Sequence, residues 1–247
     1  MNALVVDLGN THWKAAHVGA QGLTGVLTGP YDDLDRLRDV IVVGGGNGVR
    51  ALVASVAPEH RYSWFMQLAQ GAGLRVERID GRRPLGGVRP GYRKPEQLGV
   101  DRLLAMVAVR AMTQSPFCVI DAGTAVTLDF VDAGGQHLGG LILPGQRLAR
   151  EALLANTAIP RDDSVEVGDR LGLDTPTGIA LGGRYAVAAI AEMFLTGSRA
   201  LFTGQSAAVF VGGGDADAVA SALSLPCTKI ENLVLRGLAE LVYHGEG

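Results

Sequence analysis

The strongest constraint on the fold is a short pattern that the chain contains twice. The first copy, LVVDLGNTHWK, runs from Leu4 to Lys14, and the second, VIDAGTAVTLD, runs from Val119 to Asp129. In each copy an apolar run ends in an aspartate, a glycine follows two residues later, and polarity then alternates. This order predicts a buried strand, a tight turn and a hairpin partner. Two copies in two halves of the chain predict two related domains that face each other across a cleft.

The residues of both turns suit a phosphate-binding loop. A glycine lets the backbone approach a ligand closely, and turn N–H groups with the hydroxyls of Thr11 and Thr124 can form an anion cradle. Asp7 and Asp121 would repel a phosphate unless a cation lay between them. A single Asp-x-Gly is more often a plain hairpin turn. Its repetition favours two phosphate-facing loops with a metal in the cleft.

Hydrophobic periodicity and turn residues predict an α/β chain. Strands are predicted over 2–8, 12–18, 40–43, 51–56, 75–79, 117–121, 124–131, 137–142 and 207–211. Helices are predicted over 58–73, 99–112, 145–156, 175–195, 215–223 and 230–243. Residues 80–98 are rich in Gly, Pro, Arg and Lys and predict a long loop, a kind of segment that is often functional. The predicted domains are 1–115 and 116–247.

Composition excludes several classes of protein. The chain has 247 residues, of which 47% are hydrophobic, and a net charge of −3, which argues against disorder and against a nucleic-acid or anionic-membrane surface. We expect no apolar run that approaches the about 18 residues needed to span a bilayer, and no signal peptide. Cys118 and Cys227 have no metal-ligand spacing, so we expect reduced thiols in a cytoplasmic protein.

Several motifs together carry a resemblance to a known family. The double turn is similar to the acetate and sugar kinase, Hsp70 and actin superfamily, whose two ribonuclease H-like domains bind ATP between them. DLGNT at 7–11, LGVDR at 98–102, DAGTAVTLD at 121–129 and GGLILPG at 139–145 occur in the order of type III pantothenate kinases, and VASVAP at 53–58 fits the same family. The resemblance spans most of the chain. It implies an α/β fold of two ribonuclease H-like domains, the actin-like ATPase fold, around a nucleotide cleft.

The activity that this resemblance implies is ATP-dependent phosphorylation of pantothenate to 4′-phosphopantothenate, the first step of coenzyme A biosynthesis. It also implies a homodimer, Mg²⁺ with ATP, and a monovalent cation, K⁺ or NH₄⁺. Two alternatives stay open on the sequence. One is another member of the superfamily, such as a sugar kinase or a polyphosphate hydrolase. The other is a non-enzymatic accessory or regulatory relative.

The resemblance assigns the first turn to the ATP phosphates. The implied contacts are Asp7, Leu8, Gly9, Asn10, Thr11, His12, Trp13 and Lys14. Asp7 would also help to hold Mg²⁺, through water. His12 departs from the Arg or Thr that is frequent in the family, and we expect it to be a strand residue rather than a catalyst. In the second turn Asp121 matches a ligand of the monovalent cation, and Thr124 matches a contact with ATP.

Asp101 stands near the start of a predicted helix. On the sequence alone, an aspartate there more often complements the helix dipole or caps the helix. The resemblance carries Gly99, Val100, Asp101 and Arg102 over as the family's GxDR motif in the substrate site, with Asp101 as proton acceptor. A carboxylate can orient a hydroxyl for phosphoryl transfer and accept its proton late. Arg102 would bind the carboxylate of pantothenate, the alternative being a surface arginine.

Two further substrate contacts rest on the resemblance. Tyr92 lies in the long predicted loop and matches the family's substrate-contacting tyrosine. Thr175 matches a threonine that reaches pantothenate across the dimer interface in known members, although Thr175 followed by Pro176 is also a suitable helix cap. Residues 212–215, GGGD, lack the GxGxxG spacing and better suit a turn that faces adenosine.

Overall fold

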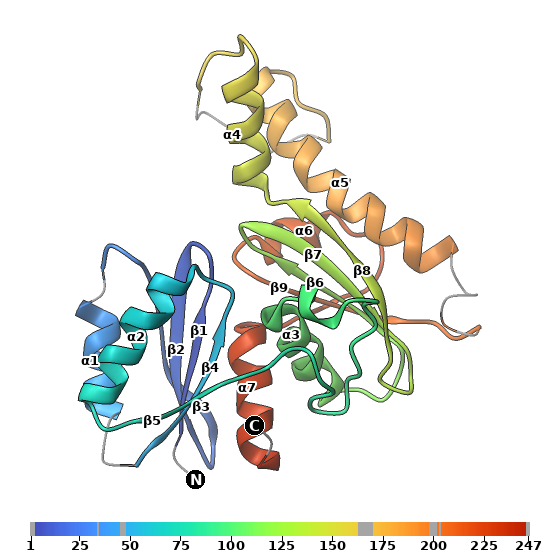
Figure 1. Cartoon of the computed structure of the whole chain (residues 1–247). Helices are drawn as coiled ribbons and strands as arrows, with labels where there is room; N and C mark the ends of the chain where they lie inside the picture. The colour runs from blue at the N-terminus through green and yellow to red at the C-terminus, as the bar shows by residue number, and fades with distance from the viewer. Residues whose placement is uncertain are drawn as a thin grey trace. The chain divides into compact units, whose positions relative to one another are not determined.

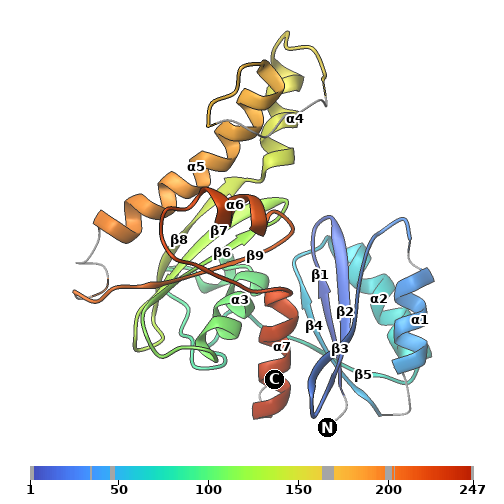
Figure 2. The same cartoon turned by 180° about the vertical axis from the view of Figure 1, so that it is seen from behind.

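A computed structural model describes residues 3–33, 35–44, 48–162, 170–197, 202 and 204–245. Internal contacts divide the chain into two compact units, which Figures 1 and 2 show from opposite sides. Unit 1 comprises Met1–Gln114, Gly134–His137 and Asn232–Gly247, and unit 2 comprises Ser115–Ala133 and Leu138–Glu231. This division differs from the predicted domains of 1–115 and 116–247, because the C-terminal segment groups with unit 1.

Unit 1 is built on a five-stranded sheet of order β3-β2-β1-β4-β5. The strands are β1 (Ala3–Leu8), β2 (His12–Gly19), β3 (Gly22–Pro30), β4 (Arg50–Ser55) and β5 (Arg75–Arg78). The helices are α1 (Asp35–Gly44), α2 (Glu59–Gly71), α3 (Val100–Arg110) and α7 (Leu233–His244). β1 pairs antiparallel with β2 and parallel with β4, so the strand that carries Asp7 is central.

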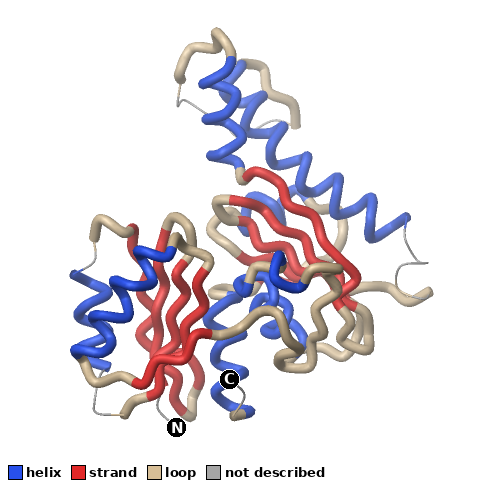
Figure 3. Tube along the Cα trace, viewed as in Figure 1, coloured by secondary structure: helices blue, strands red, loops and turns tan. Residues whose placement is uncertain are grey.

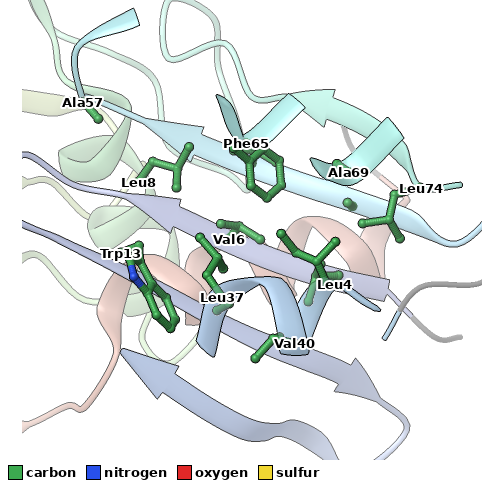
Figure 4. Packing of buried hydrophobic residues seen from close by; sticks show 14 residues of the cluster. Leu4, Val6, Leu8, Trp13, Leu37, Val40, Ala57, Phe65, Ala69 and Leu74 are labelled. Atoms are coloured by element: carbon green, nitrogen blue, oxygen red, sulfur yellow. The ribbon is translucent and has the colours of Figure 1, made fainter. Parts of the chain in front are cut away.

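The two faces of this sheet have different partners. Leu4, Val6 and Leu8 of β1 join a buried cluster with residues of α1 and α2, including Leu37 and Phe65 (Figure 4). Because successive side chains of a strand point to opposite faces, Asp7 lies on the other face. Helix α7 contacts β1, β2 and β4, and it also packs on α3. This packing explains why the C-terminal helix belongs to unit 1.

Unit 2 is built on a second sheet, of order β10-β9-β6-β7-β8. Its strands are β6 (Phe117–Ala122), β7 (Ala125–Val131), β8 (His137–Pro144), β9 (Ala208–Gly212) and β10 (Thr228–Lys229). Its helices are α4 (Gln146–Asn156), α5 (Thr175–Gly197) and α6 (Ala216–Ala222). Alternate residues of β6, such as Ile120, pack with Val187 and Ala191 of α5 and Val219 of α6. Asp121 therefore lies on the face opposite this cluster.

The two sheets have the same topology. Read from β3 in unit 1 and from β8 in unit 2, the strand orders are β3-β2-β1-β4-β5 and β8-β7-β6-β9-β10. In both, the strand with the acidic turn is central, antiparallel to the next strand and parallel to a later one. The internal repeat predicted from the two sequence copies is thus a repeat of the fold. Figure 3 shows the strands of both sheets in red and the helices in blue.

Most predicted elements are confirmed, and one strand is wrong. Val40–Val43 was predicted as a strand but lies in α1, where Leu37, Val40 and Ile41 bury one helical face. The strands β3 and β10 were not predicted. The long loop over 80–98 is confirmed and contains one short 3₁₀ turn, Pro95–Gln97. The sequence also predicts a turn at the glycine run 44–46 and a polar loop over 160–172, of which residues 45–46 and 163–169 lie outside the described residues.

Helix α5 corrects one expectation about membranes. In the described part of the chain, Thr175–Thr196 has the length and hydropathy of a membrane span, and 22% of its apolar window is buried in the structure. One such helix is weak evidence and does not by itself indicate a membrane protein. Its exposed apolar side chains include Tyr185 and Met193, and Leu171 and Leu173 just before it are also exposed.

Candidate active site

The first acidic turn begins at Asp7, one residue before the end of β1. Asp7 pairs with Lys14 of β2 and Ala54 of β4, and only 8% of it is exposed. The N–H of Gly9 donates to the carbonyl of His12 at 3.1 Å, which closes the turn. A Cβ at Gly9 would lie 2.9 Å from the same carbonyl oxygen, so the turn requires glycine at this position.

Two side chains from other elements bind the carbonyl groups of this turn. The Tyr31 hydroxyl donates to the carbonyl of Gly9 at 2.8 Å, and Nη1 of Arg61 donates to the carbonyl of Asn10. The Arg61 guanidinium lies 3.9 Å from the centre of the Tyr31 ring. Burial raises the pKa of Tyr31 to about 12, Arg61 opposes the shift and the charge of Asp7 adds to it. Tyr31 is therefore protonated, and a donor, at neutral pH.

The structure restricts how two of the predicted ATP contacts could act. Leu8 and Trp13 are fully buried in the unit 1 core, and the Trp13 indole donates to the carbonyl of Pro30 at 3.0 Å. Because both side chains are packed in the core, a contact of either residue with ATP would go through its backbone. His12 is exposed and is the first residue of β2, a strand residue as predicted.

Asp101 lies in the first turn of α3, half-buried, two residues after the N-cap Gly99. Its Oδ1 accepts the N–H of Arg102 at 2.8 Å, so it does satisfy one amide at the helix start. A Cβ at Gly99 would collide with the same carboxylate oxygen. The glycine of the motif therefore makes room for the aspartate two residues later.

Arg102 and Tyr92, two predicted substrate residues, are brought together. Arg102 is 6% exposed, which rules out a surface arginine, and its Nη1 donates to the Tyr92 hydroxyl at 2.6 Å. The Tyr92 ring stacks on His137, with centroids 5.7 Å apart and planes 20° apart. His137 is 1% exposed, and its Nδ1 accepts the N–H of Gly91 at 3.4 Å. The loop tyrosine is thus held by an arginine on its hydroxyl and a histidine on its ring.

The second acidic turn, in unit 2, begins at Asp121, which is half-buried and pairs with Thr127 and Gly212. The N–H of Gly123 donates to the carbonyl of Ala125 at 3.1 Å. Thr124, at the tip of the turn, is exposed. This turn has the same place in its sheet as the turn at Asp7 has in unit 1.

Backbone segments from two other parts of unit 2 enclose this turn. The N–H of Gly145 donates to the carbonyl of Thr124 at 3.0 Å, and the N–H of Asp215 donates to the carbonyl of Ala122 at 2.9 Å. A Cβ at Gly145 would collide with the turn carbonyls. Gly213 has φ +93°, and a Cβ there would collide with the backbone of Ala122. The segment 212–215 therefore lies against the acidic turn.

Thr175 is the exposed first residue of α5. The carboxylate of Asp174 accepts the N–H of Thr177 at 2.8 Å, so Asp174 is the capping side chain. The alternative that Thr175 caps the helix is wrong. Pro176 in the first turn is compatible with helix geometry, because amides there have no partner within the helix.

Asp7 and Asp121 are suited to cations that take their other ligands from a nucleotide, from water or from backbone carbonyls. In the described residues, no group of three His, Cys, Asp or Glu side chains could hold a metal ion. Mg²⁺ bound to a nucleotide takes most of its ligands from phosphate and water and needs one or two carboxylates. Asp7, at the end of a strand and beside a turn, fits that requirement.

Sequence reasoning missed Tyr31, Arg61 and His137. Tyr31 follows β3, Arg61 lies in the first turns of α2, and His137 begins β8. None of them stands in a motif or shows a spacing that marks a site. Each is recognised only from its contact with a residue distant in the sequence.

Comparison with solved structures identifies the fold. A Baf family transcriptional activator from Campylobacter jejuni has a TM-score of 0.63 and 17% identity, over 98% of each chain. The archaeal actin homolog Ta0583 has a TM-score of 0.52 and 13% identity, over 99% of this chain and 100% of the other. At these identities the likeness shows the fold alone. The chain has the two-domain actin-like ATPase fold, as predicted.

Comparison of sequences identifies the family. The family model described as type III pantothenate kinase matches residues 3–196. The type III pantothenate kinase of Halorhodospira halophila is 36% identical over 259 residues, which cover 98% of each chain. That of Azoarcus sp. is 35% identical over 240 residues, covering 96% of this chain and 89% of the relative. Matched in this way along nearly its whole length, the chain belongs to the type III pantothenate kinase family.

Proposed function

We propose that this chain transfers the γ-phosphoryl group of ATP to the 4′-hydroxyl of pantothenate, with Asp101 as the base. Membership of the type III pantothenate kinase family carries the reaction: ATP-dependent phosphorylation of pantothenate in coenzyme A biosynthesis. The Baf family transcriptional activator would suit the alternative of a non-enzymatic relative, but at 17% identity it shows the fold alone.

Asp101 prepares the hydroxyl of pantothenate. A carboxylate in the first turn of a helix lies in the positive field of the helix N-terminus, which favours its charged form. Its Oδ1 accepts the N–H of Arg102, and Gly99, which has no side chain, leaves the space beside this oxygen open. Phosphoryl transfer needs the nucleophile placed in line more than it needs early deprotonation. Asp101 therefore orients the hydroxyl and accepts its proton as the P–O bond forms.

Arg102 and Tyr92 bind the other end of pantothenate. Arginine can donate to a carboxylate through two parallel N–H bonds, and its guanidinium has five donors, one of which serves Tyr92. The Tyr92 hydroxyl, held by Arg102, keeps its own proton for the substrate. Gly99 and Val100 contribute backbone at the same helix end. His137 fixes the Tyr92 ring by stacking.

The turn from Asp7 to Lys14 binds the phosphates of ATP. Its backbone N–H groups and Thr11 hydroxyl contact the phosphate oxygens, and Asp7 holds the accompanying Mg²⁺ through water. Mg²⁺, when bound, offsets phosphate charge. Thr124 contacts ATP from the second turn, and Asp121 is a ligand of a monovalent cation, K⁺ or NH₄⁺, together with backbone carbonyls.

We further infer that the active form is a homodimer in the cytoplasm, with no nucleic-acid or membrane partner. The exposed apolar residues along α4 and α5, among them Leu148, Leu153 and Met193, support burial against a second copy. Thr175, exposed at the start of α5, would reach the pantothenate of the partner subunit. Both cysteines, Cys118 and Cys227, are free thiols, which suits a reducing compartment.

One assay tests the reaction and the base together. The purified chain is incubated with ATP, MgCl₂, KCl and pantothenate, and mass spectrometry identifies the product. We expect 4′-phosphopantothenate, with a sugar panel inert. Asp101→Asn should fold normally and lower kcat by about 10²- to 10⁴-fold, the usual contribution of a general base. An undiminished rate in this variant would remove Asp101 from the mechanism.

A further inference from the structure

We propose that Tyr31 and Arg61 are positioning residues that orient the first turn for binding the phosphates of ATP. They form what we call the carbonyl clamp: Tyr31 donates to the carbonyl of Gly9, and Arg61 donates to the carbonyl of Asn10. The inference rests on the proposed function, since it concerns how the same turn binds ATP. All four residues belong to unit 1.

Holding these two carbonyls decides where the next two amides point. A trans peptide group is planar, and its C=O and N–H point in opposite directions. The bond from Tyr31 to the Gly9 carbonyl therefore directs the N–H of Asn10 away from Tyr31. The bond from Arg61 to the Asn10 carbonyl does the same for the N–H of Thr11. A rotated peptide would instead aim a carbonyl oxygen at the phosphates and repel them.

The two members of the clamp support each other. The Arg61 guanidinium lies 3.9 Å from the centre of the Tyr31 ring, a distance typical of a cation–π contact. Arg61 is in turn fixed by its position in α2, where its own N–H donates to the carbonyl of Pro58 at 2.9 Å. Tyr31 directly follows β3. The turn is thereby tied to a strand end and to a helix start.

A similar pair, Tyr62 of α2 and Arg78 of β5, provides a matched control. The Arg78 guanidinium lies 4.1 Å from the centre of the Tyr62 ring, and Arg78 pairs with Glu59 at 3.2 Å. This pair repeats the aromatic–guanidinium chemistry, although Arg78 is more exposed than Arg61. In the part of the chain that the structure describes, Arg78 donates to Glu59 and not to the turn at 9–12. Substitutions in this pair report what losing such a surface contact costs by itself.

The experiment compares Tyr31→Phe and Arg61→Gln with Tyr62→Phe and Arg78→Gln in the full-length protein. Isothermal titration measures the Kd of Mg·ATP without pantothenate, and steady-state kinetics give both KM values and kcat. Loss of one hydrogen bond to the turn should raise the Kd and KM for ATP about three- to tenfold in each clamp variant. The KM for pantothenate should stay unchanged, and both control variants should stay within about twofold of wild type.

The double variant Tyr31→Phe/Arg61→Gln sharpens the test. If the two residues act as one clamp, their effects are not additive, and the double variant binds ATP little worse than Arg61→Gln alone. An effect of Arg61→Gln with unchanged ATP affinity in Tyr31→Phe would mean that Arg61 contacts the phosphates directly, and it would overturn the clamp. Melting curves show whether each variant is folded.

Failure of the clamp and failure of the proposed function give different results. If the wild type binds Mg·ATP but does not phosphorylate pantothenate, the proposed function fails and the Kd series still decides on the clamp. If the wild type is active and all four single variants bind ATP alike, the clamp is overturned while the function stands. If the wild type does not bind Mg·ATP, both are overturned.

Discussion

The two acidic turns have the same place in the same topology, but different parts of the protein support them. In unit 1, side chains hold the turn after Asp7: the Tyr31 hydroxyl and the Arg61 guanidinium bind its carbonyls. In unit 2, backbone encloses the turn after Asp121, through the segments at Gly145 and Gly213. The turn in unit 1 is supported by hydrogen bonds from side chains that are distant in the sequence. The turn in unit 2 is supported by close contact between main-chain segments.

This difference predicts how each turn responds to substitution. Where side chains support the turn, a substitution can remove one hydroxyl or one charge and leave the remaining contacts in place. Backbone segments in contact leave no space for a single added carbon, so the smallest substitution forces the chain to move. The two turns have the same place in the fold, but we expect them to differ in which substitutions they tolerate.

Among substitutions in the two turns, the largest expected effect comes from removing the charge of Asp7 or of Asp121. Asp7→Asn and Asp121→Asn should each lower kcat/KM by about 10²- to 10³-fold, the range for removing one electrostatic partner of a phosphoryl group. They should differ in their ion dependence. Asp7→Asn should shift the MgCl₂ activation curve, and Asp121→Asn should shift the KCl curve. Titration of each salt at saturating substrates measures both.

The assignment of different ions to the two turns depends on that contrast. A KCl activation curve for Asp121→Asn that matches wild type would contradict the monovalent-cation role. Circular dichroism on both variants serves as the control for folding.

Gly213→Ala should give the next largest effect, on stability. Its φ of +93° is unfavourable for alanine, and the Cβ would collide with the backbone of Ala122. We expect a loss of about 3 kcal/mol in the free energy of unfolding, measured by urea denaturation. Gly214→Ala is the matched control, because a Cβ there meets nothing within 4 Å, and it should change stability by less than about 0.5 kcal/mol. Equal stabilities for the two variants would refute the backbone-support model.

Tyr31→Phe should give the smallest effect, about 1 kcal/mol of unfolding free energy at pH 7, through loss of one hydrogen bond. Its pH dependence is distinctive. Burial raises the pKa of Tyr31 to about 12, with Asp7 adding and Arg61 opposing, against an ordinary value of 10.0. Between pH 10 and 12 the unfolded chain has lost this proton and the folded chain keeps it, so wild-type stability falls as pH rises.

The stability gap between wild type and Tyr31→Phe should therefore be constant from pH 7 to 9 and should narrow from pH 10 to 12. Urea denaturation at each pH measures it. A gap that stays constant through pH 12 would mean that the Tyr31 hydroxyl is not buried as the structure has it.

Local patterns predicted much of this molecule. The buried strand and turn around Asp7, the copy around Asp121 and the helix that begins at Val100 all follow from hydrophobic period and turn residues. A period of two or of 3.6 residues is visible in a window of about ten. The apolar run at Val40–Val43 was too short to show either period, which is why a helix was predicted as a strand.

Some elements carry little signal of their own. Strand β3 (Gly22–Pro30) has few buried residues and contains Gly25 at positive φ, so neither alternation nor apolar content marks it. Its pairing with β2 forms it. The placement of residues 232–247 in unit 1 likewise depends on α7 packing against β1 and α3, far away in the sequence.

The sequence by itself determined the repeat, the α/β class, the positions of both acidic turns and the motif around Asp101. Only the tertiary structure decided what supports them: Tyr31 and Arg61 on one turn, glycine-lined backbone on the other, and His137 behind Tyr92. The reason is physical. Secondary structure and turns depend on neighbouring residues and leave a period in the sequence, whereas a supporting contact between distant residues leaves none until the chain has folded.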